Sequence, residues 1–429
     1  MMISYEEALA RILRHARPLS SVRVRLEDAL GCYLAESIRA REPVPLFDQS
    51  AMDGFGVRAS DVAEARTDSP ARLRVAGMVR AGDDARGMLR RGTAVRIFTG
   101  AKIPPGVQAV VVQEYCEETG GEVLVRESVP DGKNIRRKGE EIRRGARVLS
   151  AGARITPPVI GLLATLGFST FLVHRKPRVT LLVTGNELVA LGKPLRPGRI
   201  RDSNSHALAA ALKDTGIQEV SVRRVKDDEA LLRQALMAAL QDSDFVITSG
   251  GVSVGEYDLV KDAAVSAGVR TVFWKVAVKP GMPNYFGVWK RGRGRGKGVG
   301  KAAGKSAALG RTLLFGLPGN PVSALVSYHQ FVRLALLKMS GQRAPGRFVF
   351  PAALEKDVSK KAGRAEFVRG VVRVNNGALC VVPTDQQGSH MLSGLASANC
   401  LIHLASDATF VEHGRQVPVE LLSWEMHGE

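Results

Sequence analysis

The sequence predicts a multidomain protein of the α/β plus β class, with one doubly wound α/β domain and further β-rich parts. Between residues 177 and 340, short apolar segments alternate with amphipathic ones, which is typical of strands and helices in a mainly parallel sheet. Residues 47–137 and 345–429 instead show short alternating runs separated by glycine and proline, which indicates strands and turns. A length of 429 residues suggests about three domains.

The pattern divides the chain into four parts. We expect a mixed α/β linking domain (1–46 with 138–174), a β-rich domain (47–137), the α/β domain (175–340) and a C-terminal β-domain (341–429). The low-complexity insertion Gly292–Gly310 interrupts the α/β domain, and its composition predicts a disordered basic loop.

Apolar runs and helical periodicity define the expected elements of the α/β domain. The expected strands are Val179–Val183, Val220–Val225, Phe245–Ile247, Val269–Trp274 and Leu313–Phe315. The expected helices are His206–Lys213, Asp228–Leu240, Tyr257–Ala267 and Val322–Met339.

Composition restricts the partners. The net charge is +19 and the stretch from Lys290 to Arg311 holds eight basic residues and no acidic one, so anionic partners are favoured. Aromatic residues make up only 5%, which argues against a stacking platform for single-stranded nucleic acid. Ser4 and Glu7 predict a capped helix at the start of the chain. No apolar run reaches membrane-spanning length, so no membrane partner and a cytoplasmic location are expected.

Three glycine-bearing turns follow predicted strands of the α/β domain: Thr184–Leu188, Thr248–Gly255 and Gly316–Pro321. Glycine lets a backbone approach a ligand closely, and amide groups at the following helix starts favour phosphate. A single turn of this kind is usually only a tight connection. Three in one domain, at the edge where α/β sheets bind ligands, indicate an anionic or nucleotide-like ligand.

Carboxylates lie near these turns, and they allow two interpretations. Asp227 and Asp228 precede an expected helix, where an acid commonly caps the helix. Glu187, Asp202 and Asp258 also follow strand ends or precede helices, and such acids can hold Mg²⁺ together with substrate phosphates.

Lys275 and Lys279 lie four residues apart in an apolar run that ends at Pro280-Gly281. In an extended strand these positions share one face. Two ammonium groups there are costly among apolar residues unless they meet anions, so we expect an anion site rather than a solvated strand edge.

Taken together, the motifs resemble the molybdopterin molybdenumtransferase family, which includes bacterial MoeA and the C-terminal domain of gephyrin. They keep the family's order over almost the whole chain. In one-letter code they are SAMDGF (50–55), FTGA (98–101), NIRRKGEE (134–141), TGNEL (184–188), RDSN (201–204), SGGVSVGEYD (249–258), FWKVAVKPGMP (273–283), GLPGNPVSA (316–324) and QGSH (387–390).

The resemblance implies an elongated four-domain subunit that forms a homodimer, with active sites shared between the α/β domain of one subunit and the β-rich domain of the other. Matching positions imply catalytic roles for Asp53, Thr99, Glu187, Asp228, Asp258, Lys275 and Lys279. They imply substrate-binding roles for Gly250, Gly251, Ser253, Pro318, Asn320, Pro321 and Ser389. Glu187 and Asp258 would be the ligands of Mg²⁺.

The implied reaction inserts molybdenum from molybdate into adenylylated molybdopterin and releases AMP, a late step of molybdenum cofactor synthesis. Lysines and backbone amides suit the anionic substrates, and Mg²⁺ would neutralise charge on the bridging oxygens. A partner adenylyltransferase is compatible with the resemblance, and nucleic acid is not expected.

The sequence departs from the family pattern at four places. Asn186 stands where Asp is common, Met282 where a third lysine often follows Pro-Gly, and Glu141 where Asp is common. The basic insertion Gly292–Gly310 is foreign to the pattern. Two alternatives stay open: a molybdopterin adenylyltransferase, and a non-enzymatic scaffold or nucleic-acid binder that uses the insertion.

Overall fold

The computed structural model describes residues 2–84, 87–251, 259–291 and 310–422. The chain forms two compact units. The first contains residues 1–35, 152–156 and 170–429, and the second contains residues 36–151 and 157–169. Among the described helices, none combines the length and the apolar composition needed to cross a membrane.

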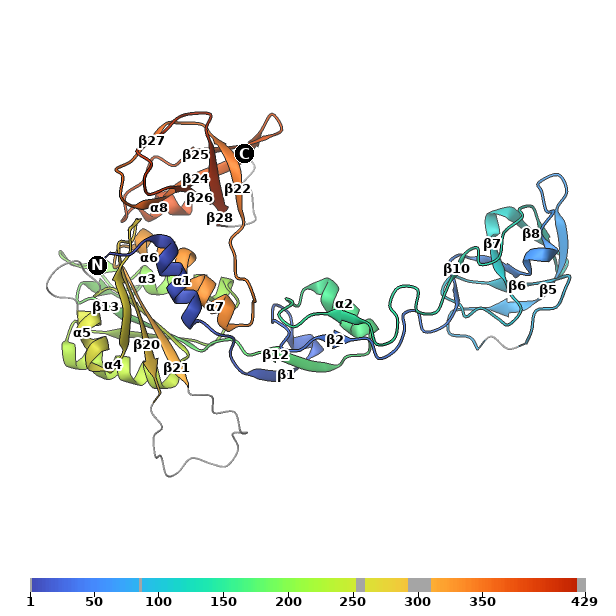
Figure 1. Ribbon diagram of the computed structural model, residues 1–429, viewed down its shortest axis with the longest axis horizontal. Helices are drawn as coiled ribbons and strands as arrows, with labels where there is room; N and C mark the ends of the chain where they lie inside the picture. The colour runs from blue at the N-terminus through green and yellow to red at the C-terminus, as the bar shows by residue number, and fades with distance from the viewer. Residues whose placement is uncertain (1, 85–86, 252–258, 292–309, 423–429) are drawn as a thin grey trace, which may run out of the picture. The chain divides into compact units, whose positions relative to one another are not determined.

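A six-stranded sheet in the order β16-β13-β17-β21-β20-β18 forms the centre of the first unit (Figure 1). Four neighbouring strands are parallel, as the sequence predicts. They are β16 (Val220–Val225), β13 (Val179–Thr184), β17 (Phe245–Ser249) and β21 (Arg311–Leu317). The sequence did not reveal β20 (Pro283–Lys290), which runs antiparallel to β21 and to β18 (Arg270–Lys275).

Helices cover both faces of this sheet, because the strand side chains alternate between two apolar clusters. Leu181 packs in a cluster with Leu208 of α3, whereas its neighbour Leu182 packs in a cluster with Leu232 of α4. The first face carries α1 (Tyr5–His15), α3 (Asn204–Asp214), α6 (Pro321–Ser327) and α7 (Arg333–Met339), and the second carries α4 (Glu229–Asp242) and α5 (Leu259–Ser266).

One predicted helix start is confirmed, and one predicted helix has a different form. Ser4 Oγ accepts a hydrogen bond from the Glu7 amide, so α1 begins at the predicted cap. The expected long helix Val322–Met339 is helical throughout, but a π-helical turn at Tyr328–Val332 separates α6 from α7.

The C-terminal part of the first unit closes into a barrel. Its five strands are β22 (Val349–Leu354), β24 (Ala365–Asn375), β25 (Ala378–Pro383), β26 (Cys400–Leu404) and β28 (Gln416–Leu421). Each pairs with two others, with the β24–β26 pairing as the closure. The helix α8 (Leu392–Ala396) and the short pair β23 (Val358–Ser359) and β27 (Phe410–Val411) lie in the connections.

The second unit contains another six-stranded sheet, in the order β7-β4-β6-β5-β9-β8. Its strands are β4 (Gly54–Val57), β5 (Ala71–Val79), β6 (Thr93–Ile97), β7 (Ala109–Val112), β8 (Cys116–Thr119) and β9 (Glu122–Val125). Short pairs complete the chain: β1 (Ser21–Arg25) with β12 (Thr170–His174), β2 (Ile38–Arg39) with β11 (Arg147–Leu149), β3 (Gln49–Ser50) with β10 (Ile135–Arg136), and β14 (Leu188–Val189) with β15 (Ile200–Arg201). Helix α2 (Pro157–Thr165) belongs to the second unit.

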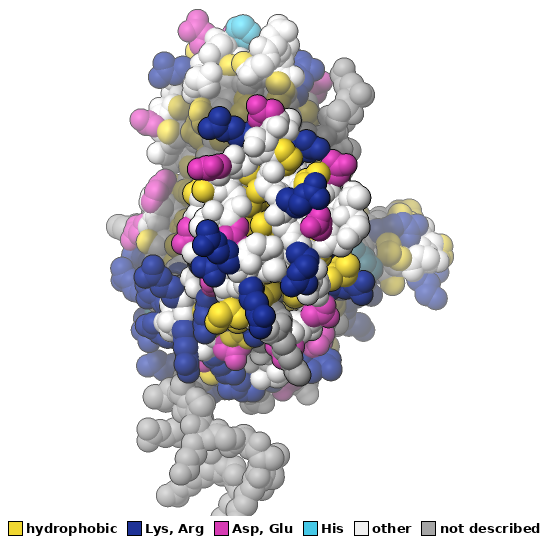
Figure 2. All heavy atoms as spheres, turned by 90° about the vertical axis from the view of Figure 1, so that its right-hand side faces the viewer, with side chains coloured by type: hydrophobic (Ala, Val, Ile, Leu, Met, Phe, Trp, Pro, Cys, Tyr) yellow, Lys and Arg dark blue, Asp and Glu magenta, His cyan; other side chains and the backbone are white. Residues whose placement is uncertain are grey.

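Basic side chains are spread over the surface and do not form a single patch on the face that Figure 2 shows. On the face that Figure 2 shows, Lys and Arg side chains are spread widely, with Asp and Glu side chains between them. The net charge of +19 therefore does not arise from the basic insertion alone, because Gly292–Gly310 contributes only five of the 61 Lys and Arg residues.

Candidate functional site

The predicted glycine turns meet at one edge of the α/β sheet. Strands β13, β17 and β21 are parallel neighbours, so the segments that follow them lie at the same, carboxyl edge. Gly250 and Gly251 have positive φ of 88° and 68°, which side chains rarely adopt. A Cβ atom on Gly250 would lie 2.5 Å from the carbonyl oxygen of Thr184. Only glycine fits there.

Asn204 fastens two of these turns together. Its Nδ2 donates to Ser249 Oγ (2.9 Å) and to the Gly319 carbonyl (2.8 Å). Gly319 is a neighbour of Gly250, because a Cβ on it would lie 3.8 Å from the Cα of Gly250, an ordinary van der Waals distance. Asn204 lies in the RDSN motif (201–204), but the motif by itself does not indicate this role. The turns thus form a backbone-lined cradle, defined here by Thr184, Gly250, Gly251 and Gly319 with Asn204 as its clamp.

Two buried hydroxyl groups lie beside this cradle. Thr184 Oγ1 and Thr248 Oγ1 are buried and have no hydrogen-bond partner within the described residues. Buried polar groups normally have a partner, so this edge of the sheet is prepared for a polar contact. Thr184 is the last residue of β13 and Thr248 is the last but one of β17, and both strands lead into glycine turns, a signal that is visible in the sequence.

The acids near the turns divide into structural and available groups. Asp228 is the N-cap of α4, and its Oδ1 accepts from the Leu231 amide at 2.8 Å. Asp227 is not left free by this cap, as its Oδ2 accepts from the Asn186 amide (2.9 Å) and its own amide donates to Asn186 Oδ1 (3.2 Å). The departure from Asp at position 186 therefore keeps an acceptor that the Asp227 amide uses.

Asp202 has a structural role. It is 1% exposed, its carboxylate accepts from the Ser205 amide and hydroxyl, and it pairs with Arg224 at 2.8 Å. Burial alone would raise the pKa of Asp202, but the Ser205 hydrogen bonds and the Arg224 charge together lower it. Glu187 is different, because it is exposed and its carboxylate has no hydrogen bond or ion pair within the described segments, although its backbone carbonyl accepts from the Ile200 amide at 2.9 Å.

The two predicted lysines do not share one strand, so the reasoning from an extended i, i+4 pair was wrong. Strand β18 ends at Lys275, and the chain then leaves the α/β sheet. Val278 and Lys279 (β19) pair instead with Ala365 and Glu366 of β24, in the C-terminal sheet. The apolar run from Phe273 to Lys279 is not one strand, because its first part pairs in the α/β sheet and its last part pairs in the C-terminal sheet.

Each lysine has a distinct environment. Lys275 Nζ lies 4.5 Å from the centre of the Trp274 ring, a cation–π contact. Lys279 Nζ pairs with Glu366 Oε1 at 2.7 Å. Lys279 also lines a cavity of about 380 Å³ together with Lys360, Lys361 and Arg364, which the sequence analysis did not single out. Met282, at the position of a family lysine, contributes its carbonyl to the Val276 amide.

Ser389 lies beside the third glycine turn. Asn320 Nδ2 donates to Ser389 Oγ at 3.0 Å, and the Val322 amide donates to the Ser389 carbonyl at 3.2 Å. The structure thus joins two family motifs that are far apart in the sequence. Pro318 and Pro321 flank the same turn, with Pro321 in the first turn of α6.

The loop that presents Ser389 is built around a buried arginine. Arg369 is 1% exposed, and its Nη2 donates to the carbonyls of Gln386 (2.6 Å) and Gly388 (3.3 Å). Its Nε has no partner, and none of the ion pairs in the described part of the chain includes it. Burial lowers the pKa of Arg369. Sequence reasoning missed this residue because a single arginine in a strand gives no signal.

Asp53 and Thr99 lie together in the second unit. Asp53 Oδ1 accepts from both the Thr99 amide (2.7 Å) and the Thr99 hydroxyl (2.8 Å). These hydrogen bonds lower the pKa of Asp53, so it is an anion at neutral pH. The pairing of the two residues, expected only from the resemblance, therefore exists within one unit.

The described residues provide no closed metal cage. No group of three or more His, Cys, Asp or Glu side chains among them could hold a metal ion. Mg²⁺ does not require one, because it commonly binds one or two carboxylates plus substrate phosphates and water. The free carboxylate of Glu187 beside the cradle fits this mode. The other predicted ligand, Asp258, and the predicted substrate residue Ser253 lie outside the described residues.

The glycine-lined carboxyl edge of the parallel strands is the usual ligand-binding edge of doubly wound α/β proteins, and this chain therefore belongs to that class. Comparison with known families is consistent with the class. Residues 3–167 match the MoeA N-terminal region (domain I and II), residues 180–338 a probable molybdopterin binding domain, and residues 351–422 the MoeA C-terminal region (domain IV).

Individual relatives match over their full length. The chain is 36% identical to the molybdopterin molybdenumtransferase of Haemophilus influenzae, covering 98% of each chain. It is 38% identical to molybdopterin molybdenumtransferase 2 of Mycobacterium tuberculosis, covering 97% of this chain and 98% of the relative. A crystal structure of a molybdopterin biosynthesis MoeA protein from Pyrococcus horikoshii matches with a TM-score of 0.79 at 29% identity, over 99% of this chain and 100% of that one. The chain belongs to the molybdopterin molybdenumtransferase family.

Proposed function

We propose that this protein transfers molybdenum from molybdate to the dithiolene of adenylylated molybdopterin and releases AMP. The curated relatives that support this proposal carry the name molybdopterin molybdenumtransferase. The observation that carries it is the backbone cradle beside the Asn320–Ser389 contact, since a phosphate-bearing ligand needs close backbone approach.

The cradle would bind the phosphate-bearing part of the substrate. Backbone amides of the turns are strong donors to phosphate oxygens, and the absence of side chains at Gly250 and Gly251 lets the ligand approach them. The hydroxyls of Thr184 and Thr248 add two donors without a competing partner in the described segments. Asn204 would hold the two turns in place during turnover.

The basic cavity at Lys279 would bind molybdate. Its lining carries Lys361 and Arg364 in addition to Lys279, and only one carboxylate, Glu366. Lys360 contributes less directly, because its ammonium group already donates to the carbonyls of Ala405 and Ala408 at 2.8 Å. A volume of about 380 Å³ exceeds what one oxyanion fills, so water or part of the second substrate would share it.

Mg²⁺, held by Glu187 and by Asp258, would neutralise charge on the bridging phosphate oxygens when bound. The lysines and the turn amides would orient the phosphate-bearing substrate and molybdate. Asp228 caps α4 and keeps the start of this helix in place. Asp228 Oδ2 has no partner in the described structure, so the cap leaves one oxygen for substrate or metal.

We also propose a cytoplasmic homodimer in which a second subunit supplies the Asp53–Thr99 pair. Two hydrogen bonds preorganise the pair, in which Thr99 is exposed and Asp53 is partly exposed, and this supports a role toward a ligand rather than in folding. The division of the chain into four domains, with boundaries at residues 46, 137, 174 and 340, stays a prediction.

The test is incubation of the purified protein with adenylylated molybdopterin, molybdate and Mg²⁺. The readouts are the amount of AMP released and the amount of molybdenum cofactor formed, measured after separation from the protein. We expect AMP and inserted molybdenum in equal amounts. Adenylylation of molybdopterin from ATP, without molybdenum insertion, would instead identify an adenylyltransferase and refute the proposal.

Lys275→Ala and Lys261→Ala make a matched pair for this assay. Both ammonium groups lie on the Trp274 ring, at 4.5 and 4.3 Å, so both changes remove a similar contact. We expect Lys275→Ala to lower insertion by a factor of about 10² while Lys261→Ala retains most activity. Equal effects would assign the loss to packing on Trp274 and remove Lys275 from the site.

A further inference from the structure

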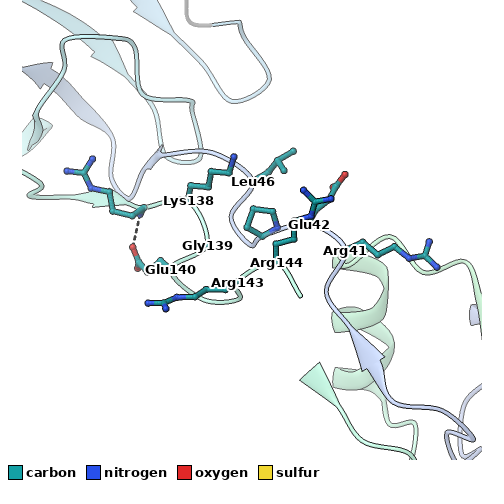
Figure 3. A pocket seen from close by; sticks show the side chains of 10 residues that line it. Arg41, Glu42, Leu46, Lys138, Gly139, Glu140, Arg143 and Arg144 are labelled. Atoms are coloured by element: carbon teal, nitrogen blue, oxygen red, sulfur yellow. Dashed lines mark hydrogen bonds between the residues drawn. The ribbon is translucent and has the colours of Figure 1, made fainter. Parts of the chain in front are cut away.

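The lining of a strongly basic groove in the second unit includes none of the residues to which the proposed reaction gives a role (Figure 3). It encloses about 1090 Å³ and is lined by five Lys or Arg side chains but only two Glu side chains. We define this basic groove by Arg41, Pro43, Leu46, Lys138, Arg143 and Arg144. Neither Asp53 nor Thr99 lines it.

The backbone beneath the groove is firmly held. Val44 and Ile142 exchange two hydrogen bonds, of 2.8 and 3.0 Å, and the Gly139 amide donates to the Pro45 carbonyl at 2.9 Å. Gly139 has φ of 72°, and a Cβ on it would lie 3.3 Å from Pro43 Cβ. The two crossing segments are therefore fixed by pairing, and a ligand would meet a preformed surface.

Most of the positive charge in the groove is uncompensated. Arg137 pairs with Asp48 at 2.9 Å. Lys138, Arg143 and Arg144 are exposed and take part in none of the ion pairs formed by the described residues. Three like charges close together raise one another's energy, which an anionic partner would relieve.

The directions of the side chains argue for an extended partner. In Figure 3 the basic side chains spread outward from the crossing segments, with Arg143 on one side and Arg41 on the other. They do not converge on one point, as donors to a single small anion would. An elongated anionic chain can reach several of them at once.

Two features favour a polypeptide over a nucleic acid. Leu46 is 50% exposed and lies with Pro43 among the charges, while the lining has no aromatic ring on which a base could stack. Glu42 and Glu140 also interrupt the basic lining, which disfavours a continuous phosphate backbone. An apolar contact within a ring of arginines is typical of protein interfaces.

We propose that the basic groove docks an acidic segment of a partner protein, in which carboxylates flank an apolar side chain that covers Leu46. At this basic groove the net charge of +19 disfavours a second copy of this chain, so the homodimer proposed above would form through other surfaces. The arginines would bind carboxylates in bidentate fashion, and the apolar contact would fix the register.

The test uses a fluorescein-labelled peptide of Glu-Glu-Leu repeats, with polyglutamate and polyuridine as comparison probes. The full-length protein is titrated at a fixed salt concentration and Kd is measured by anisotropy. We expect the peptide to bind most tightly. A triple reversal, Lys138→Glu with Arg143→Glu and Arg144→Glu, should raise its Kd at least about tenfold, or 1.4 kcal/mol.

The matched control reverses three exposed arginines elsewhere in the same unit: Arg66→Glu, Arg74→Glu and Arg90→Glu. It changes the net charge equally and should alter Kd less than about threefold. Leu46→Ser should weaken the Glu-Glu-Leu peptide but not polyglutamate. Equal losses in both triple variants, tighter binding of polyuridine at the groove, or no peptide binding would overturn the proposal.

Discussion

A single methyl group at Gly250 offers a sharp test of the backbone cradle. In Gly250→Ala the new Cβ would lie 2.5 Å from the Thr184 carbonyl oxygen, and the residue would have to keep a φ of 88°. A left-handed conformation costs a non-glycine residue roughly 1–2 kcal/mol. Normal contact requires more than 3 Å, so the turn must also move away from Thr184 by several tenths of an ångström.

The combined cost is about 2–3 kcal/mol of unfolding free energy. For a domain of this size that corresponds to a fall in Tm of roughly 4–10 °C. A displaced turn should also lower the rate of AMP release far more than stability alone requires, by a factor of about 10², since small misplacements of binding groups are costly. Differential scanning calorimetry and the AMP assay measure the two effects.

Gly319→Ala is the matched control. It adds the same methyl group to the neighbouring turn, but there the Cβ would lie 3.8 Å from Gly250 Cα, an ordinary contact. Its Tm should stay within about 2 °C of the wild type. If both variants behave alike, or if Gly250→Ala keeps its Tm and its activity, then the close approach of Gly250 to the Thr184 carbonyl is not a constraint. In that case the turns do not form a cradle that requires glycine.

Three further changes separate the site from the scaffold. Asp53→Asn keeps an acceptor for Thr99 but loses the charge, so molybdenum insertion should fall by about 10² while Tm is unchanged; a full rate would exclude Asp53. Arg369→Met removes the buried cation beneath the Ser389 loop, so insertion should fall at least about tenfold with little change in Tm, whereas the exposed Arg373→Met should have no effect on either. Asp244 forms a bidentate pair with Arg175, and although burial alone would raise the pKa of Asp244, these contacts lower it. Its stabilisation is therefore complete above the unfolded-state value of 3.8 and is lost as the pH falls towards the folded-state value, so Asp244→Asn should cost about 3 kcal/mol at neutral pH and progressively less in acid. Thermal scans at several pH values measure that difference, and a constant difference down to the lowest pH would contradict it.

The sequence determined the arrangement along the chain. Apolar runs located the buried parallel strands β13, β17 and β21, because a buried parallel strand must be apolar on both faces. Glycines located the ligand edge, because turns after parallel strands meet there and a side chain at Gly250 would strike Thr184. Family motifs in a fixed order indicated the family before any contact was known.

Tertiary structure decided which of these residues meet. Lys275 and Lys279 look like one strand, but pairing of Lys279 with β24 divides the run between two sheets, and no local pattern reports which sheet a strand joins. Ser389 reaches Asn320 only because the barrel closes and Arg369 holds its loop. Whether an acid caps a helix, as Asp228 does, or stays free, as Glu187 does, depends on the neighbouring amides that folding brings within hydrogen-bond distance. Spacing along the chain cannot contain that information, because contacts between distant residues are set by packing of whole elements.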